Sequence, residues 1–375
     1  VKKVDVRVSL FSAIAGKYIA EVEVVAPKVI VEKNAEGKFN YEVPPSPEQK
    51  KEGDSPGDGS RPFVQAALKV RDGEVLVRAK GRETVYTNLS LAAKVDTLAK
   101  PIDYSLSFES PAKDRLEARG SYDLESMSGP ATLLLERVSL KNLAAAASAY
   151  SPVTELDGTV TGKLDYRLQG RLRFAGKADL EVAGFTAVLG DRTVRLDRVT
   201  LRHDGTLDEG GNGKHTILVG SGKALDGQVV VDVTDGLGAR AAKTTVSFQS
   251  DLAALAATLR GLGSLPPGLA LEGKVTLEGK IDSKGPTDAE LKAGTFLPAA
   301  SWDLALTGTG LAVTMDGKPA RLDQMSLRDQ STMDPKGNIR SQIVLRAGKA
   351  LDAVLTTDGK DLLGDARSVQ ARVDA

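Results

Sequence analysis

The sequence contains no cysteine and few aromatic residues. Its 375 residues include 0 Cys, 1 Trp and 2 His, and aromatic side chains make up 4%. The absence of cysteine excludes disulfides, but it assigns no compartment, because both cytosolic proteins and proteins of oxidising compartments can lack it. The scarcity of aromatic residues argues against a surface on which sugars or nucleic-acid bases stack.

An excess of charge of one sign is also lacking, and so is any long apolar run. The 50 basic side chains balance the 50 acidic ones, which removes the usual electrostatic basis for binding nucleic acid or a broadly anionic membrane. No apolar stretch approaches the ~20 residues that cross a bilayer. Since the chain begins at Val1 rather than Met, a signal or membrane anchor upstream of it stays open.

Alternation of apolar and polar residues with a period of two is abundant. Val4, Val6 and Val8 alternate with charged neighbours, and similar runs recur as far as 343–345. This alternation gives each strand one apolar and one polar face. Six of the Asp-Gly pairs in the chain, a combination that favours tight hairpin turns, are interspersed with these runs. They begin at Asp72, Asp204, Asp226, Asp235, Asp316 and Asp358. The sequence therefore predicts a mainly β protein in which one antiparallel hairpin follows another.

Three short helices and one irregular segment interrupt this pattern. We expect helices at 9–15, in the Ala-rich stretch after Asn142, and at 252–260, where Asp251 supplies the N-cap. Residues 44–62 are rich in Pro, Gly and charge without periodicity. That composition predicts a mobile loop.

The second half of the chain repeats itself. The offset between the copies is 109 at the helix caps Asn142 and Asp251, and 126 at the Arg-Leu-Asp motifs 195–197 and 321–323. Such a repeat indicates a unit stacked on a copy of itself, and hence an elongated molecule. We expect an N-terminal β module, two β-groove repeats, and then a further element or a C-terminal tail, at 1–138, 139–249, 250–360 and 361–375.

Motifs for catalysis and metal binding are incomplete. A Gly-Lys pair resembles the end of a phosphate loop, but Ala224 follows it in place of Ser or Thr. The segment from Asp54 lacks the middle carboxylate and the final Glu of a calcium loop. His203 and His215 lack metal-ligand spacing, so solvated loop or strand positions are expected for both. We expect no catalytic residue, no metal site and no cofactor.

The aliphatic strand faces have little to cover them. In a sandwich two sheets bury their faces against each other, but here few aromatic residues and few helices are available. A long sheet that curls would instead leave an aliphatic trough, and a large exposed apolar surface marks a binding site. The candidate lining residues, for which ordinary core packing is the alternative, are Val4, Val6, Val8, Val22, Val24, Val29, Val31, Val75, Val77, Leu89, Leu91, Leu106, Phe108, Val229, Val231, Leu304, Leu306, Leu311 and Val313.

The first 41 residues follow a familiar order. An apolar strand at 6–11 and a turn ending at Gly16 lead to Pro27, a strand at 29–31, and Glu-Gly-Lys-Phe-Asn-Tyr at 36–41. This order resembles the N-terminal region of the AsmA-like family of bacterial envelope proteins, and the repeats are similar to the later pattern of that family. The chain departs from the family in lacking its membrane anchor and in having Glu-Gly where Asp-Gly is usual in the first turn.

The resemblance implies a curled, taco-shaped antiparallel sheet with a hydrophobic groove. It also implies a phospholipid or another acyl-chain lipid as partner, and a periplasmic location with an inner-membrane anchor upstream of this chain. The expected function is non-enzymatic, with the groove binding or conducting acyl chains across the periplasm. The alternative is a structural or assembly scaffold whose apolar face is covered by protein partners of an envelope complex. Lipid extraction separates the two, because a scaffold carries no lipid.

Overall fold

The computed structural model describes most of the chain, in two compact units. The first unit consists of residues 1–171 and 186–191, and the second of residues 172–185 and 192–375. The described residues are 1–9, 12, 17–32, 63–79, 82–97, 100–109, 114–141, 153–170, 173–189, 192–236, 238, 240–261, 268–285, 298–315, 317–348, 351–360 and 368–374.

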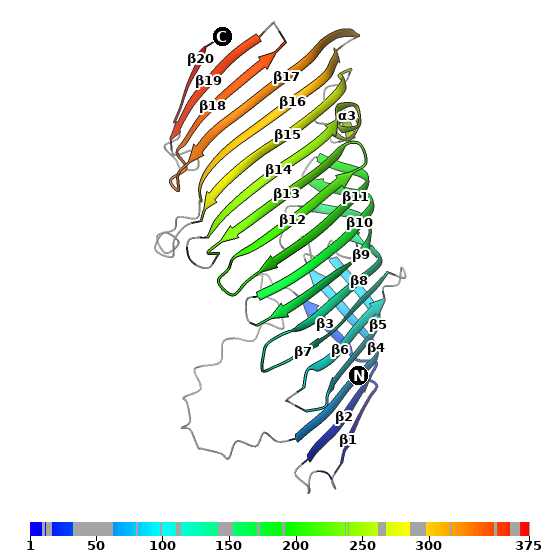
Figure 1. Ribbon diagram of the computed structural model, residues 1–375. Coiled ribbons are helices and arrows are strands. Elements are labelled where there is room, and N and C mark those ends of the chain that lie inside the picture. The colour runs from blue at the N-terminus through cyan, green and yellow to red at the C-terminus, as the bar shows by residue number, and fades with distance from the viewer. Residues whose placement is uncertain are drawn as a thin grey trace. The chain divides into compact units, whose positions relative to one another are not determined.

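Nearly all of these residues lie in β-strands (Figure 1). The twenty strands belong to one curled, predominantly antiparallel sheet, and one helix is described. The prediction of a mainly β, curled antiparallel sheet is therefore confirmed. The helices expected at 9–15 and after Asn142 lie almost entirely outside the described residues, as does the loop expected at 44–62.

The first unit starts with the only parallel pairings that the described strands show. β2 and β3 both run parallel beside β4, separated by a break at Ala26 and Pro27, where Ala26 has a φ of 51°. β1 pairs antiparallel with β2, and from β4 to β9 each strand pairs antiparallel with the next. The strands are β1 Lys3–Val8, β2 Lys17–Val25, β3 Lys28–Glu32, β4 Phe63–Ala79, β5 Arg82–Val95, β6 Ile102–Glu109, β7 Arg115–Tyr122, β8 Gly129–Ser139 and β9 Val153–Gln169.

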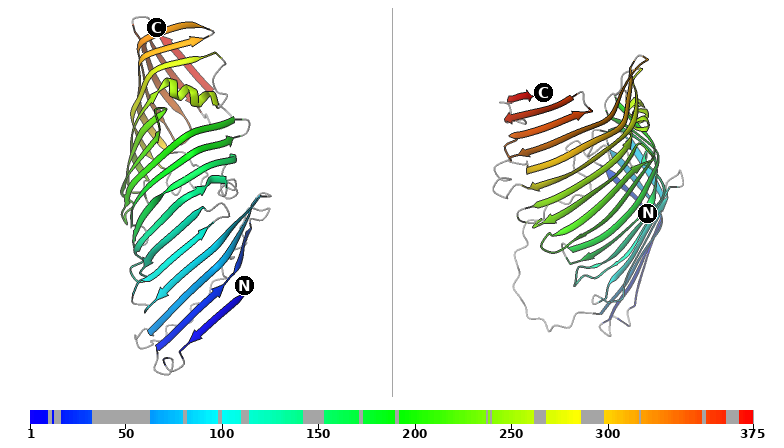
Figure 2. Two further views of the ribbon diagram at one scale, coloured as in Figure 1. Left: turned by 90° about the vertical axis from the view of Figure 1, so that its right-hand side faces the viewer. Right: turned by 45° about the horizontal axis from the view of Figure 1, so that its top comes forward.

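The second unit is an antiparallel meander (Figure 2). From β11 to β20 each strand pairs with the next in sequence, the pattern that short connections between strands impose. Its elements are β10 Arg173–Leu189, β11 Arg192–Leu207, β12 Gly213–Ser221, β13 Leu225–Thr234, β14 Ala241–Asp251, α3 Leu252–Gly261, β15 Ala270–Lys284, β16 Ala299–Met315, β17 Lys318–Met333, β18 Ile339–Ala347, β19 Leu351–Lys360 and β20 Ser368–Asp374.

Helix α3 forms where the sequence predicts it. The Asp251 carboxylate accepts hydrogen bonds from the backbone N–H groups of Ala253 and Ala254, both at 3.0 Å, which satisfies donors that the first helical turn leaves free. The helix packs against β11, β14 and β15. The two strands between β11 and β14, which are β12 and β13, are shorter than β11 and β14. Ala256 is only 1% exposed, because a side chain this small lets the helix lie close to the strands.

Four of the six expected Asp-Gly turns are wrong. The pairs beginning at residues 72, 204, 226 and 358 lie inside β4, β11, β13 and β19, whereas Gly236 and Gly317 lie between strands. The reason for glycine at two of these positions is close packing. A Cβ on Gly227 would overlap the ring of Phe248, and a Cβ on Gly205 would overlap the imidazole of His215.

The repeat seen in the sequence is also present in the strands. β10 to β13 start 126 residues before β16 to β19 (173 and 299, 192 and 318, 213 and 339, 225 and 351). Glycines with positive φ recur as well, with Gly184 at 60° and Gly310 at 58°, and Gly158 at 123° and Gly273 at 112°. The corresponding strands of the two repeats therefore start at equivalent positions and have glycines of similar conformation at equivalent places. The module boundaries at 138/139, 249/250 and 360/361 stay predictions.

Candidate functional site: an aliphatic sheet face

The strand registers give the first unit an aliphatic face. Val6 of β1 lies opposite Val22 of β2, which lies beside Leu68 of β4. Leu91 of β5 lies opposite Val70 of β4 and Leu106 of β6. Directly opposite residues share a face and alternate with those of the other face. The registers thus place on one face the predicted lining residues Val4, Val6, Val8, Val22, Val24, Leu89, Leu91, Leu106 and Phe108. They pair Val29 with Val75 and Val31 with Val77 beyond the register shifts of β4.

The pairing of β4 with β5 and of β5 with β6 contains register shifts. A contact between two aromatic rings shows that the aliphatic residues on either side of these shifts lie on the same face. Tyr86, opposite Val75, stacks edge-on against Phe108 with ring centroids 5.0 Å apart. The Tyr86–Phe108 contact therefore places Val75 on the same face as Leu106. Burial raises the pKa of Tyr86, as expected for a phenol on an apolar surface.

On the opposite face of the first unit, β2 and the adjoining part of β4 carry charged residues. Lys69 pairs with Glu21 at 2.9 Å, and Arg71 pairs with Glu23. These residues alternate in sequence with the aliphatic ones. Exposed pairs of this kind add little stability. Their consequence is that this face is adapted to water, whereas the aliphatic face is not.

The second unit has the same two faces. Val229 lies opposite Val246, Val246 opposite Gly279, and Gly279 opposite Leu304, so the aliphatic face continues across β13 to β16. Asp303, next to Leu304 in sequence, pairs with Arg328 on the other face at 2.5 Å. The six lining residues predicted in this unit share the aliphatic face: Val229, Val231, Leu304, Leu306, Leu311 and Val313.

Leu311 reaches this face through a β-bulge. The register between β15 and β16 shifts between Glu272 and Lys274, opposite Gly310. The bulge turns the Leu311 side chain against Gly308, where it is 9% exposed. Leu311 is therefore a packed residue, in contrast to its neighbours on the face.

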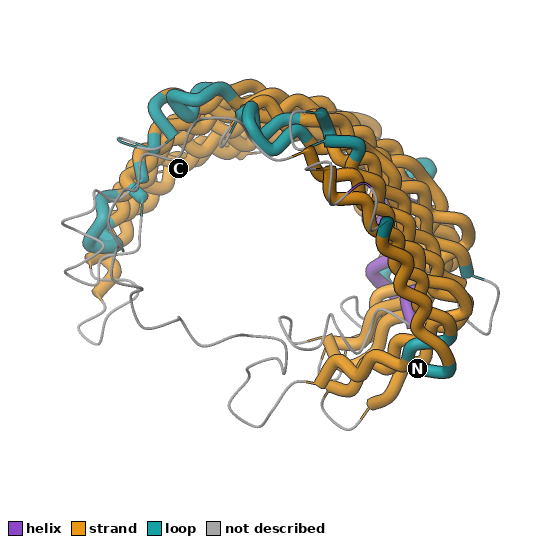
Figure 3. The backbone as a smooth tube through the Cα atoms, turned by 90° about the horizontal axis from the view of Figure 1, so that it is seen from below, coloured by secondary structure: helices purple, strands orange, loops and turns teal. Residues whose placement is uncertain are grey.

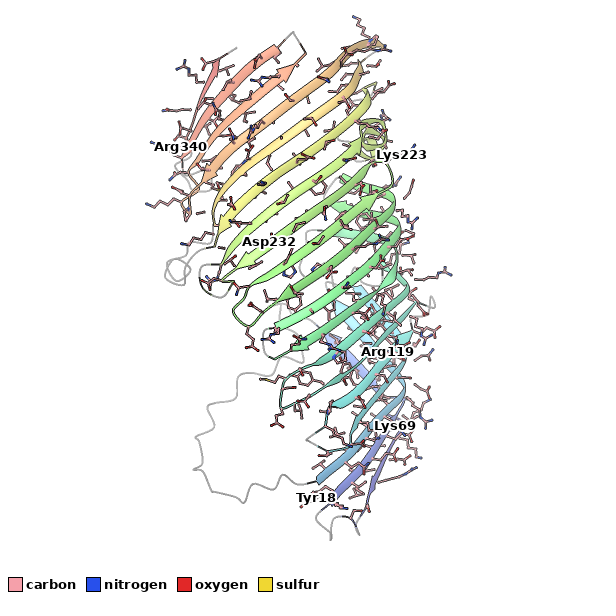
Figure 4. The ribbon with its side chains drawn as sticks, in the orientation of Figure 1. Tyr18, Lys69, Arg119, Lys223, Asp232 and Arg340 are labelled. Carbon is pink, nitrogen blue, oxygen red and sulfur yellow. The ribbon has the colours of Figure 1, made fainter. Side chains whose placement is uncertain are left out.

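Most of the aliphatic face is only partly covered. Val4, Val6 and Val8 are 54%, 61% and 57% exposed, and Val29 and Val313 are 43% and 40% exposed. Among the described residues no large side chain is fully buried. The strands bend along their length (Figure 3). Figure 4 labels four residues that lie on the charged faces, which are Lys69, Arg119, Asp232 and Arg340.

Two polar clusters interrupt the aliphatic face of the second unit. In the first, His203 of β11 and His215 of β12 stack with their rings 12° from parallel, and Nε2 of His203 lies 3.1 Å from Nδ1 of His215. Both are half-buried, and Phe174 lies 5.7 Å from His215 between ring centroids. Burial first, and His203 second, lower the pKa of His215. Both histidines lie in strands, as the sequence predicts, but they are half-buried and contact each other.

The second cluster surrounds a carboxylate. Asp329 of β17 accepts hydrogen bonds from Trp302 Nε1 at 2.9 Å, from Ser341 Oγ at 2.8 Å, and from Ser331 Oγ. Partial burial acts to raise the pKa of Asp329, but the three hydrogen bonds outweigh it and leave this pKa below its usual value. Ser331 is 5% exposed. The carboxylate is thus held ionised on the aliphatic face.

The two clusters occupy equivalent places in the repeat. His203 and Asp329, His215 and Ser341, and Gly205 and Ser331 are each 126 residues apart. Sequence reasoning missed both clusters because each joins residues of separate strands, and only the register brings them side by side. Asp329 also stands in the polar run 328–331, which hides the alternation.

The aliphatic face holds no arrangement typical of a metal centre. The described residues contain no cluster of three or more His, Cys, Asp or Glu side chains that could bind a metal ion. None of the helical segments that the structure describes has the length and apolar character needed to cross a bilayer. No model of a known protein family, no curated protein and no solved structure matches the chain.

Proposed function

We propose that this protein is a non-enzymatic lipid carrier whose aliphatic face binds, or conducts, the acyl chains of phospholipids. The observation that carries the proposal is the separation of the two faces. In each unit aliphatic side chains continue from strand to strand on one face, whereas ion pairs occupy the other. A contiguous, partly exposed apolar surface indicates a binding site for an apolar partner.

The mechanism is passive. Acyl chains lie against the aliphatic residues, and each methylene that leaves water contributes about 0.8 kcal/mol. The head group stays in water. Because aliphatic contacts are non-directional, a bound chain can move along the face by exchanging one set of aliphatic neighbours for the next.

The proposed setting rests on the resemblance to the AsmA-like family. Membership of that family accounts for the strand order at 1–41 and for the repeats. On this basis we propose that the protein lies in the periplasm of a bacterial envelope, attached to the inner membrane through a segment upstream of this chain. The chain's neutral net charge is consistent with a partner recognised by apolar contact rather than by charge.

A scaffold in an envelope complex is the second candidate. The observation that favours it is the exposure of β20, in which Val369 and Val373 are 64% and 65% exposed. Terminal strands of a sheet readily pair with another chain. In that case proteins rather than lipid would cover the aliphatic face, and the purified protein would carry no lipid.

Lipid extraction and mass spectrometry of matched variants test the proposal. Leu89→Asp combined with Leu106→Asp places charge on the aliphatic face of β5 and β6, and we expect it to abolish co-purifying lipid. Ser90→Asp combined with Ser105→Asp places the same charges, in the same diagonal relation, on the opposite face, and we expect lipid to remain. Equal lipid content in the two variants, with both folded by circular dichroism, would refute the proposal.

A further inference from the structure

Asp329 is a carboxylate in aliphatic surroundings. On its own face it lies opposite Leu304 of β16 and Ile343 of β18, and Leu327 is its neighbour along β17. None of these neighbours is basic, and its hydrogen-bond donors are Trp302, Ser331 and Ser341. Asp303, next to Leu304, lies on the charged face and pairs with Arg328.

A negative charge in such a place is costly unless it is compensated. Removing a carboxylate from water disfavours its ionised form, and an apolar residue would continue the aliphatic face without that cost. The three donors stabilise the ionised form, but they are neutral and leave the net charge in place. The site therefore presents a preorganised negative charge to whatever lies on the aliphatic face.

Trp302 adds the second element of the site. Its indole N–H donates to Asp329 Oδ2 at 2.9 Å, which fixes the aromatic ring beside the carboxylate. An aromatic ring next to a carboxylate attracts an ammonium group, because the ring quadrupole and the negative charge act in the same direction. Thr357 of β19 lies opposite Ser341 and brings a further hydroxyl to the same face, suited to accept a hydrogen bond from an N–H group.

We propose that Asp329 and Trp302 bind the ammonium group of an amine-bearing lipid head group while its acyl chains lie on the neighbouring aliphatic residues. This inference rests on the proposed function and adds to it a preference for one class of lipid. The equivalent place in the first repeat holds His203 and His215, which carry no negative charge. The preference therefore belongs to the second repeat alone.

The test uses the fluorescence of Trp302, the only tryptophan of the chain. The full chain is titrated with short-chain phosphatidylethanolamine and with phosphatidylglycerol of the same acyl chains, which lacks the ammonium group. We expect phosphatidylethanolamine to bind about tenfold more tightly, the size of effect that a hydrogen bond to a charged group produces. Asp329→Asn should bring the two affinities together, and Asp303→Asn, which removes the same charge from the opposite face, should keep the preference.

The outcomes separate this inference from the proposed function. Equal affinities of the wild-type protein for the two lipids, or a preference that survives Asp329→Asn, would overturn the ammonium site and leave lipid binding intact. The wild-type comparison decides the matter even if Asp329→Asn does not fold. Ethanolamine without acyl chains should bind far more weakly, and binding as tight as that of the lipid would show a site for free amines instead. No response to either lipid, with no lipid on extraction, would remove both proposals.

Discussion

At the scale of single residues, the repeats use glycine where a long strand must pass through a left-handed conformation. Gly184 and Gly310 have φ values of 60° and 58°. Beyond the adjacent residues, no described atom lies within 4 Å of a Cβ added at either position. A side chain there meets no neighbour, so its cost is backbone strain alone.

We therefore expect Gly184→Ala and Gly310→Ala to lower the free energy of unfolding by similar amounts, about 1 kcal/mol each. Gly184→Asn and Gly310→Asn should cost less, since asparagine tolerates this conformation. Urea denaturation followed by circular dichroism measures the change. A loss several times larger at one glycine than at the other would contradict the equivalence of the two positions.

His215 makes stability depend on pH. The pKa of His215 is lowered in the folded chain, whereas unfolded histidine titrates near about 6.5. Between these two values the unfolded chain binds more protons, so stability falls as pH decreases below about 6.5. We expect His215→Gln to weaken this dependence, measured as urea midpoints across that range. The same pH dependence in the variant and the wild type would exclude His215 as its source.

At the scale of elements, alternation predicted the strands and their faces, and the helix cap predicted α3. The errors concern features that depend on a partner strand. Gly205 and Gly227 suggested turns because Asp precedes each, but they make room for rings of neighbouring strands. The parallel pairing of β2 with β4 and the Asp329 cluster likewise depend on register, which local sequence does not encode.

The cap of α3 offers a direct test at this scale. Asp251→Ala removes the acceptor for the N–H groups of Ala253 and Ala254, and we expect a loss of about 1 kcal/mol of unfolding free energy. Asp251→Ser, which restores a capping oxygen, should recover most of it. Denaturant midpoints of the two variants decide this. A serine variant no more stable than the alanine variant would show that capping is not the role of Asp251.

At the scale of the whole molecule, the account depends on the aliphatic face being where acyl chains lie. Its residues and those of the opposite face alternate along the regular stretches of the strands, as Leu304, Ala305 and Leu306 do in β16. A lipid bound on one face therefore contacts every second residue. The same alternation makes the two faces distinguishable by any method that resolves single residues.

Photo-crosslinking with a phospholipid that carries a diazirine in its acyl chain is the most direct measurement, with adducts located by mass spectrometry. We predict adducts at Val22, Leu91, Leu106 and Leu306 and none at the intervening residues of the charged face. Adducts concentrated on the charged face, or spread equally over both faces, would contradict the proposal that this sheet binds acyl chains on its aliphatic side.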